Sequence, residues 1–159
     1  MANFVDPSPS AGLPGEVHTT QKNDLGAVRN YSDGSVYIYL LGVASTVAGS
    51  VVTYVPGTFA TALIASGQKG PVAIATAAVV AADYGWYMIV GAAASTVRTA
   101  VTTNVALFAG GVAGNVDVAA VKGDQILRLF ARTPGAGGGG TTTLHIDRAS
   151  IGMSNESTG

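Results

Sequence analysis

Short apolar runs separated by turn residues dominate the chain from Tyr31 onward. The runs are rich in Val, Ile, Tyr and Phe, and they are interrupted at short intervals by Gly, Asp-Gly, Pro-Gly and Asn. This spacing is typical of strands joined by tight turns, and it predicts an all-β fold, a small β-barrel or sandwich of about eight short strands. We expect the strands at Val36–Leu41, Val51–Val55, Phe59–Ile64, Val72–Ala78, Gly85–Val90, Val105–Ala109, Ile126–Arg132 and Thr142–Asp147.

Alternation within the first of these segments predicts which side chains share a face. Side chains of a strand point to opposite sides in turn. Val36, Ile38 and Leu40 therefore face one way, and Tyr37 and Tyr39 face the other. The aliphatic face is the one we expect in a core.

The segment Ile126–Arg132 has apolar residues on both of its faces. Simple alternation places the odd-numbered residues, among them Leu129, on one side. Arg128 and Arg132 point to the other side, together with Ile126 and Phe130. Because both faces carry large apolar side chains, we expect the second face to be partly covered as well.

The two ends of the chain differ from the middle. Residues 1–30 are polar, contain several Pro and Gly, and show no sustained periodicity, so they predict an extended N-terminal arm. Residues 31–150 then form one β-rich domain, and residues 151–159 form a flexible C-terminal tail. The glycine-rich segment Gly135–Gly140 predicts a flexible hairpin tip.

Two Ala-rich segments leave the choice between helix and strand open. Ala is a strong helix former, and both Ala73–Ala82 and Ala92–Thr103 are rich in it. The clearest helical candidate is 77–84. We expect at most one short helix in the chain.

Charge is scarce in this protein. Only 11% of the residues are charged, against roughly 25% in a typical soluble domain. Surface scaling for this mass gives about one charge per 430 Å², where a typical chain has about one per 180 Å². A surface with so few charges is expected to be covered by another molecule.

The same numbers exclude several classes of partner. The net charge is −1 and no basic cluster is present, so we expect no nucleic-acid partner. The longest apolar run, 71–82, is shorter than the roughly 20 residues of a spanning helix, and the N-terminus has no signal-peptide pattern, so no membrane partner is expected. The chain has no Cys, and His18 and His145 are far apart, so we expect neither a metal site nor a cofactor.

Two sequence patterns resemble functional motifs, a dinucleotide-binding loop and a hydrolase pair, but the residues around them do not fit those functions. Gly135, Gly137 and Gly140 satisfy G-x-G-x-x-G, but a β-branched run comes next where a dinucleotide site needs a helix. His145 and Asp147 share one face of a strand, an arrangement that fits a polar cross-strand face better than a hydrolase base and its orienting acid.

The acidic residues offer no better case for catalysis. Asp33, Asp83, Asp117 and Asp124 lie in turn contexts beside Gly, Asn or short polar residues, where Asp side chains bind nearby backbone N–H groups. We therefore expect no glycosidase pair, no catalytic residues and no enzymatic activity.

Aromatic residues are the remaining candidates for a binding surface. Tyr84, Trp86 and Tyr87 hold the only Trp and two of the six Tyr. We expect these three to pack in the core or at a subunit interface, where Tyr and Trp are enriched, and we assign them, with Tyr37 and Tyr39, as interface candidates. Stacking on a sugar or a base is the alternative role for such a cluster.

The segment 49–146 as a whole resembles bacteriophage capsid decoration, or cement, proteins and related small phage head proteins. The resemblance rests on short motifs: Gly49-Ser50-Val51-Val52-Thr53-Tyr54, Gly70-Pro71-Val72-Ala73-Ile74-Ala75, Tyr84-Gly85-Trp86 with Ile89-Val90-Gly91, and Val112-Ala113-Gly114 with Gly123-Asp124. It implies a β-barrel-like domain on the capsid exterior, where a homotrimer clamps neighbouring subunits of the major capsid protein. It implies no catalytic residues.

These observations support two functional hypotheses from different classes. The first is a structural virion protein that binds the outer surface of the major capsid shell and stabilises it as a homotrimer. The alternative is a carbohydrate- or host-binding module of a phage tail or fibre, which the aromatic cluster suggests. A hydrolase using His145 and Asp147 is the weakest hypothesis.

Overall fold

The protein is an all-β molecule built from one mixed sheet. The computed structural model describes residues 12–97, 99–120, 123–136, 138 and 140–152. Eleven strands and no helix lie in this part of the chain, which confirms the predicted fold class. The strands are β1 (Val17–His18), β2 (Val28–Asn30), β3 (Val36–Leu41), β4 (Val51–Tyr54), β5 (Thr61–Leu63), β6 (Gly70–Ala75), β7 (Tyr84–Val97), β8 (Ala106–Ala109), β9 (Val116–Asp117), β10 (Gln125–Ala131) and β11 (Gly140–Ile151).

Each strand predicted from the sequence has a counterpart, and β7 and β11 are longer than predicted. The two pair with each other in an antiparallel ladder from Val90 with Asp147 to Val97 with Gly140. This ladder fixes the Ala-rich residues 92–97 as strand, because tertiary pairing overrides the helix propensity of Ala. The helical candidate at 77–84 instead forms the turn that leads into β7.

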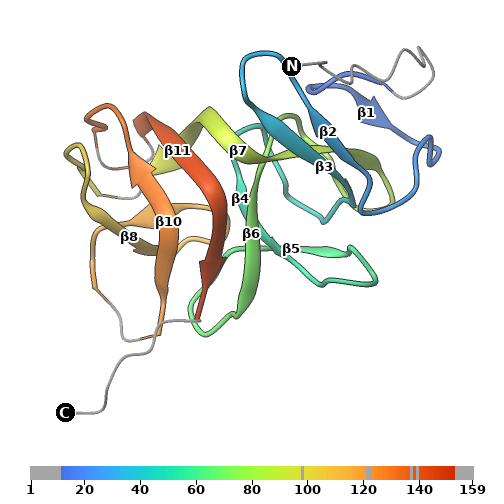
Figure 1. Cartoon of the computed structure of the whole chain (residues 1–159). Coiled ribbons are helices and arrows are strands. Elements are labelled where there is room, and N and C mark those ends of the chain that lie inside the picture. The colour runs from blue at the N-terminus through green and yellow to red at the C-terminus, as the bar shows by residue number, and fades with distance from the viewer. Residues whose placement is uncertain (1–11, 98, 121–122, 137, 139, 153–159) are drawn as a thin grey trace.

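The strand β7 connects the two halves of the molecule, as Figure 1 shows. It pairs with β1, β3, β6, β9 and β11. Val90 has partners on both of its edges, Val36 of β3 and Asp147 of β11. The next residue, Gly91, has a φ of 134°, a conformation that side chains with a Cβ rarely adopt. Before Gly91 the strand pairs mainly with β1, β3 and β6, and from Gly91 onward it pairs with β11 and β9.

Strand pairing closes two circuits that share β7. One circuit runs β3-β7-β6-β4-β5 and closes where Leu41 of β3 bridges Ala60, the residue before β5. The other runs β7-β9-β8-β10-β11 and returns to β7. Closure satisfies backbone groups that an open sheet would leave unpaired at its edges.

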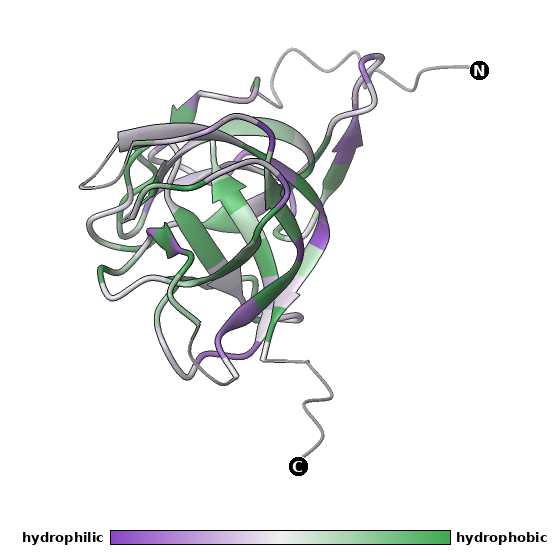
Figure 2. Ribbon diagram, turned by 90° about the vertical axis from the view of Figure 1, so that its left-hand side faces the viewer, coloured by the Kyte–Doolittle hydropathy of each residue, from purple (hydrophilic) through white to green (hydrophobic). Residues whose placement is uncertain are grey.

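Two hydrophobic cores lie on opposite faces of the layer formed by β4, β6 and the first half of β7. Alternate residues enter different cores: Val72 and Ile74 join one, and Ala73 and Ala75 join the other. A strand that is buried on both faces has apolar residues at consecutive positions, which explains the unbroken apolar run in β6. In Figure 2 the hydrophobic stretches follow the strands through the body, and the hydrophilic stretches lie mainly at loops and strand ends.

The simple alternation predicted for Ile126–Arg132 is wrong before residue 129. The pairing of β10 with β11 shifts register between Leu127 and Leu129, and Arg128 has a φ of 63°. Between the pairs Leu127–Ser150 and Leu129–Ile146, β10 has one residue where β11 has three, and this irregular step breaks the alternation and changes which side the preceding residues face. Ile126 is accordingly buried in the same core as Leu129 rather than beside the arginines.

Part of the segment expected as an N-terminal arm pairs with the domain. β1 pairs with Tyr84 and Gly85 of β7, and β2 pairs with β3. Residues 1–11 of the expected arm lie outside the described residues. At the other end Ile151 is the last residue of β11, and the rest of the expected tail from residue 153 also lies outside them.

The bend in β7 gives a prediction for stability. A Cβ at Gly91 would stand 3.1 Å from the Met88 sulfur and 3.2 Å from the Ser35 Cβ, at a φ that L residues avoid. We expect Gly91→Ala to lower the free energy of unfolding by about 1–3 kcal/mol, measured by denaturant titration. The exposed neighbour provides the control: Ala92→Ser should change it by no more than about 0.5 kcal/mol. Equal stability of the two variants would show that the bend does not depend on glycine.

Candidate functional site

The structure buries three of the five aromatic interface candidates. Tyr39, Trp86 and Tyr87 are only 0–1% exposed. These rings pack inside the chain, which agrees with the expected core packing of Trp86 and Tyr87, and they leave almost no surface for an intermolecular contact. Tyr37 and Tyr84 are half-buried and keep part of their surface.

Tyr39 and Trp86 are opposite each other in the β3–β7 ladder and form the centre of an aromatic cluster. Their ring centroids are 5.0 Å apart, and the Tyr84 ring stacks on Tyr39 at 6.4 Å. The guanidinium of Arg29, from β2, lies 4.8 Å from the centre of the Trp86 ring. A cation over the face of a Trp ring is a favourable contact, and it replaces solvent above the cluster.

His18 of β1 covers the same cluster. Its Nδ1 shares a hydrogen bond of 2.7 Å with the Tyr39 hydroxyl, which also accepts the Lys22 N–H at 3.3 Å. If Tyr39 donates to Nδ1, the ring proton is on Nε2, which faces the Glu16 carboxylate at 3.6 Å. The pKa of Glu16 lies below its usual value, mainly because the Leu13 N–H donates to its carboxylate and, to a smaller extent, because of its interaction with His18.

Neither His18 nor Arg29 stood out in the sequence as a partner of these rings. Both lie in a segment without periodicity, and Arg29 also donates to the Gly12 carbonyl at 2.7 Å. These contacts span the residues from Gly12 to Arg29 and hold the segment on the sheet. The contacts of His18 and Arg29 with the rings depend on where β1 and β2 lie on the sheet, and no local sequence pattern predicts that position.

Tyr87 belongs to the second core, on the other face of β7. Its hydroxyl donates to the Val79 carbonyl at 3.4 Å. Burial raises the pKa of Tyr87 to about 12, because the phenolate would lose its hydration inside the core. Tyr87 therefore has a structural role in the described conformation.

His145 and Asp147 lie on the same side of β11 but have separate partners. The Asp147 carboxylate accepts a hydrogen bond of 2.9 Å from the Arg128 guanidinium. The His145 ring instead packs against Phe130, opposite it on β10, with centroids 4.9 Å apart. This arrangement agrees with the polar cross-strand face expected from the sequence.

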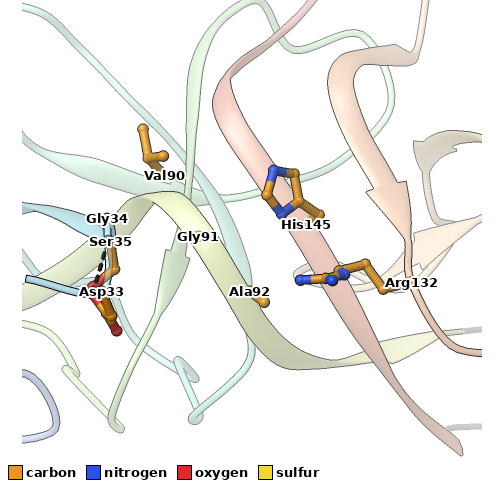
Figure 3. A pocket seen from close by; sticks show the side chains of 8 residues that line it. All are labelled: Asp33, Gly34, Ser35, Val90, Gly91, Ala92, Arg132 and His145. Carbon is orange, nitrogen blue, oxygen red and sulfur yellow. Dashed lines mark hydrogen bonds between the residues drawn. The ribbon is translucent and has the colours of Figure 1, made fainter.

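A pocket of about 280 Å³ opens at the bend of β7, and His145 forms part of its wall (Figure 3). His145 and Arg132 lie on one side, projecting from β11 and from the residue after β10. The β2–β3 turn with Asp33 and Ser35 lies on the other side, and Val90, Gly91 and Ala92 of β7 lie between them.

The acidic wall of this pocket is held by its own turn. Asp33 Oδ1 accepts hydrogen bonds from the Ser35 hydroxyl at 2.6 Å and from the Ser35 N–H at 2.9 Å. These bonds, the hydroxyl one first, lower the pKa of Asp33. The turn is closed by the Tyr31 N–H, which donates to the Ser35 carbonyl at 2.9 Å. The pocket thus has a fixed carboxylate on one side and an arginine and a histidine on the other.

Asp117 binds backbone groups of its own loop, as its sequence context predicted, whereas Asp124 binds a backbone group far away in the sequence. Asp117 accepts the N–H groups of Val118 and Ala119 at 2.7 and 3.0 Å. Asp124 accepts the Gly67 N–H at 2.8 Å and so joins two distant loops. Within the described residues, no three His, Asp or Glu side chains gather as a metal site would require.

The glycine-rich motif leads into a strand, as expected. Gly135 exchanges two backbone hydrogen bonds with Val101, and Gly140 begins β11. Gly137 lies outside the described residues. A dinucleotide pyrophosphate would need a helix N-terminus directly after the motif, and β11 occupies that place instead.

Comparisons with known proteins add no relative. Searches against models of protein families, curated proteins and solved structures found no match to this chain. Separately, no helix suited to crossing a bilayer occurs in the part of the chain that the structure describes.

The contact between Tyr39 and His18 can be tested by removing one oxygen. Tyr39→Phe leaves the buried His18 Nδ1 and the Lys22 N–H without their partner, so we expect the free energy of unfolding to fall by about 1–3 kcal/mol. Tyr37→Phe, two residues away on the same strand, should change it by less than about 0.5 kcal/mol. Denaturant unfolding of both variants measures this, and a similar small loss in both would contradict the bridging role of Tyr39.

Burial of Tyr87 predicts loss of stability at alkaline pH. The pKa of Tyr87 is about 12 in the folded protein and 10.0 in the unfolded chain. The stability that the buried neutral Tyr87 contributes is therefore complete below pH 10 and is lost as the pH rises toward 12. Between these values the slope contributed by Tyr87 reaches at most about 1.4 kcal/mol per pH unit. We expect Tyr87→Phe to unfold with a smaller alkaline slope than the unmodified protein. Equal slopes in urea unfolding above pH 10 would refute this.

Proposed function

We propose that this protein is a structural virion component, a capsid decoration protein that binds the outer surface of the major capsid shell. It acts as a homotrimer, stabilises the lattice and catalyses no reaction. The proposal combines the family resemblance of residues 49–146 with one observation on the folded chain, the scarcity of free charge on its surface.

The structure gives the accessible surface over which the few charged groups are spread. Eight Lys and Arg and nine Asp and Glu belong to a molecule with 7795 Å² of accessible surface. Several of these groups also bind within the chain. Arg29 lies on Trp86, Asp33 caps its turn, and Arg128 pairs with Asp147. These contacts engage some of the few charges within the chain, although Asp33, Arg128 and Asp147 keep contact with solvent.

A surface of this kind suits a protein that is covered on several sides by other subunits. Charged residues are depleted from the centres of protein interfaces, because each buried charge must be desolvated. Large apolar side chains are exposed on the N-terminal segment, on β2 and at strand ends and loops, rather than in one place: Leu13, Val17, Val28, Val47, Val55, Val80 and Val112. This distribution favours several contacts over one pocket-centred function.

The alternative, a carbohydrate- or host-binding module of a phage tail or fibre, has lost its original support. It rested on an aromatic platform at Tyr84, Trp86 and Tyr87. Two of these rings are buried, so their faces are not available to stack on a sugar. We therefore retain capsid decoration as the proposed function.

The test uses the purified chain and empty, expanded capsids that lack it. Light scattering should give three times the chain mass of 15.8 kDa, and the chain should sediment with the capsids and saturate a fixed number of sites. An unrelated β protein of the same size controls for trapping in the pellet. A monomer that stays in the supernatant would overturn the proposal, and a specific signal on a glycan array would favour the alternative.

A further inference from the structure

The pocket at the bend of β7 contains an arginine, Arg132, that has no acidic partner among the described residues. The other pocket wall presents Asp33, whose Oδ1 is already bonded to Ser35, and no ion pair within the described part of the chain joins it to Arg132. Arg128, which lies on β10 four residues earlier, does have such a partner in Asp147. In a chain with so few charges, a guanidinium of this kind lining a pocket requires an explanation.

The position of Arg132 is fixed by the sheet. Its backbone N–H donates to the Thr143 carbonyl at 2.8 Å, so its Cα is held where β10 meets β11. The side chain is exposed and reaches the pocket from there (Figure 3). A guanidinium presents a planar set of N–H donors that matches the two oxygens of a carboxylate.

His145 supplies a second polar group on the same side of the pocket. Its ring is half-buried and packs on Phe130, which restricts its orientation. A neutral imidazole has one N–H donor, so Arg132 and His145 together can donate to one anionic group. The volume of about 280 Å³ is ample for a single amino-acid side chain.

We propose that this pocket binds the carboxylate of an Asp or Glu side chain presented by a partner protein. The carboxylate lies between Arg132 and His145, on the side away from Asp33, whose negative charge repels it. The identification of this partner as a capsid subunit rests on the proposed function. Binding of a carboxylate by the pocket is a separate claim, because it concerns only the chemistry of the ligand.

The experiment exploits the presence of only two histidines in the chain. Imidazole signals are followed by NMR during titration with a short, end-blocked peptide that contains one glutamate, and the His145→Gln variant assigns them. We expect the His145 signals to shift and saturate, while those of the buried His18 stay in place. The glutamine version of the peptide should cause no such shift. Equal shifts with both peptides would overturn the proposal.

Three variants test which groups bind. Arg132→Gln should weaken binding of the glutamate peptide by at least about tenfold, and Arg148→Gln, an exposed arginine outside the pocket, should leave it unchanged. Asp33→Asn retains an acceptor for Ser35 but removes the repulsion, so it should tighten binding by about twofold or more. Weaker binding in Asp33→Asn would mean that the pocket prefers a cation or a hydroxyl, and the proposal would be wrong.

The peptide titration needs no capsid, so the two proposals fail separately. Capsid binding without any response to the glutamate peptide would overturn the pocket assignment and leave capsid decoration standing. A saturable response of His145 that requires Arg132, in a chain that ignores capsids, would support the pocket and remove the proposed partner.

Discussion

The pairing of β7 with five other strands is the constraint on which the rest of this structure depends. Its first half joins β1, β3 and β6, and its second half joins β9 and β11. Both strand circuits pass through it, so neither can close unless the strand bends between them. The bend falls at Gly91, where no Cβ opposes the required φ. The pocket lies at this point, where β3 begins beside Val90 and the β2–β3 turn faces Arg132 and His145.

Burial on both faces of the central layer explains part of the unusual composition. β4, β6 and the first half of β7 supply alternate residues to two cores, so few positions in these strands remain for polar side chains. The scarcity of charge therefore has an internal source in addition to the covered surface that we propose. Some of the few charged side chains have structural contacts: Asp33 binds Ser35 in its turn, and Arg29 lies over the Trp86 ring.

The candidate site residues show where reasoning along the chain stops being informative. The sequence drew attention to His145 because of Asp147, two residues away, yet its neighbour in the pocket is Arg132, which directly follows β10. Trp86 and Tyr39 were expected at an interface, yet they are covered by His18 and Arg29 from a segment without any periodic pattern. In both cases the deciding contacts join residues far apart in sequence, and a local pattern carries no record of them.

The sequence by itself determined the all-β class and the approximate position of the main strands, because alternation and turn residues act within a few positions. It also predicted that Asp33 and Asp117 bind backbone N–H groups of their own turns, whereas the bond of Asp124 to Gly67 joins two loops far apart in the sequence. Tertiary structure alone decided the length of β7 and β11, the bulge at Arg128, and the pairing of β1 and β2 with the domain. Each of these depends on hydrogen bonds and packing between distant strands, which become available only when the sheet closes.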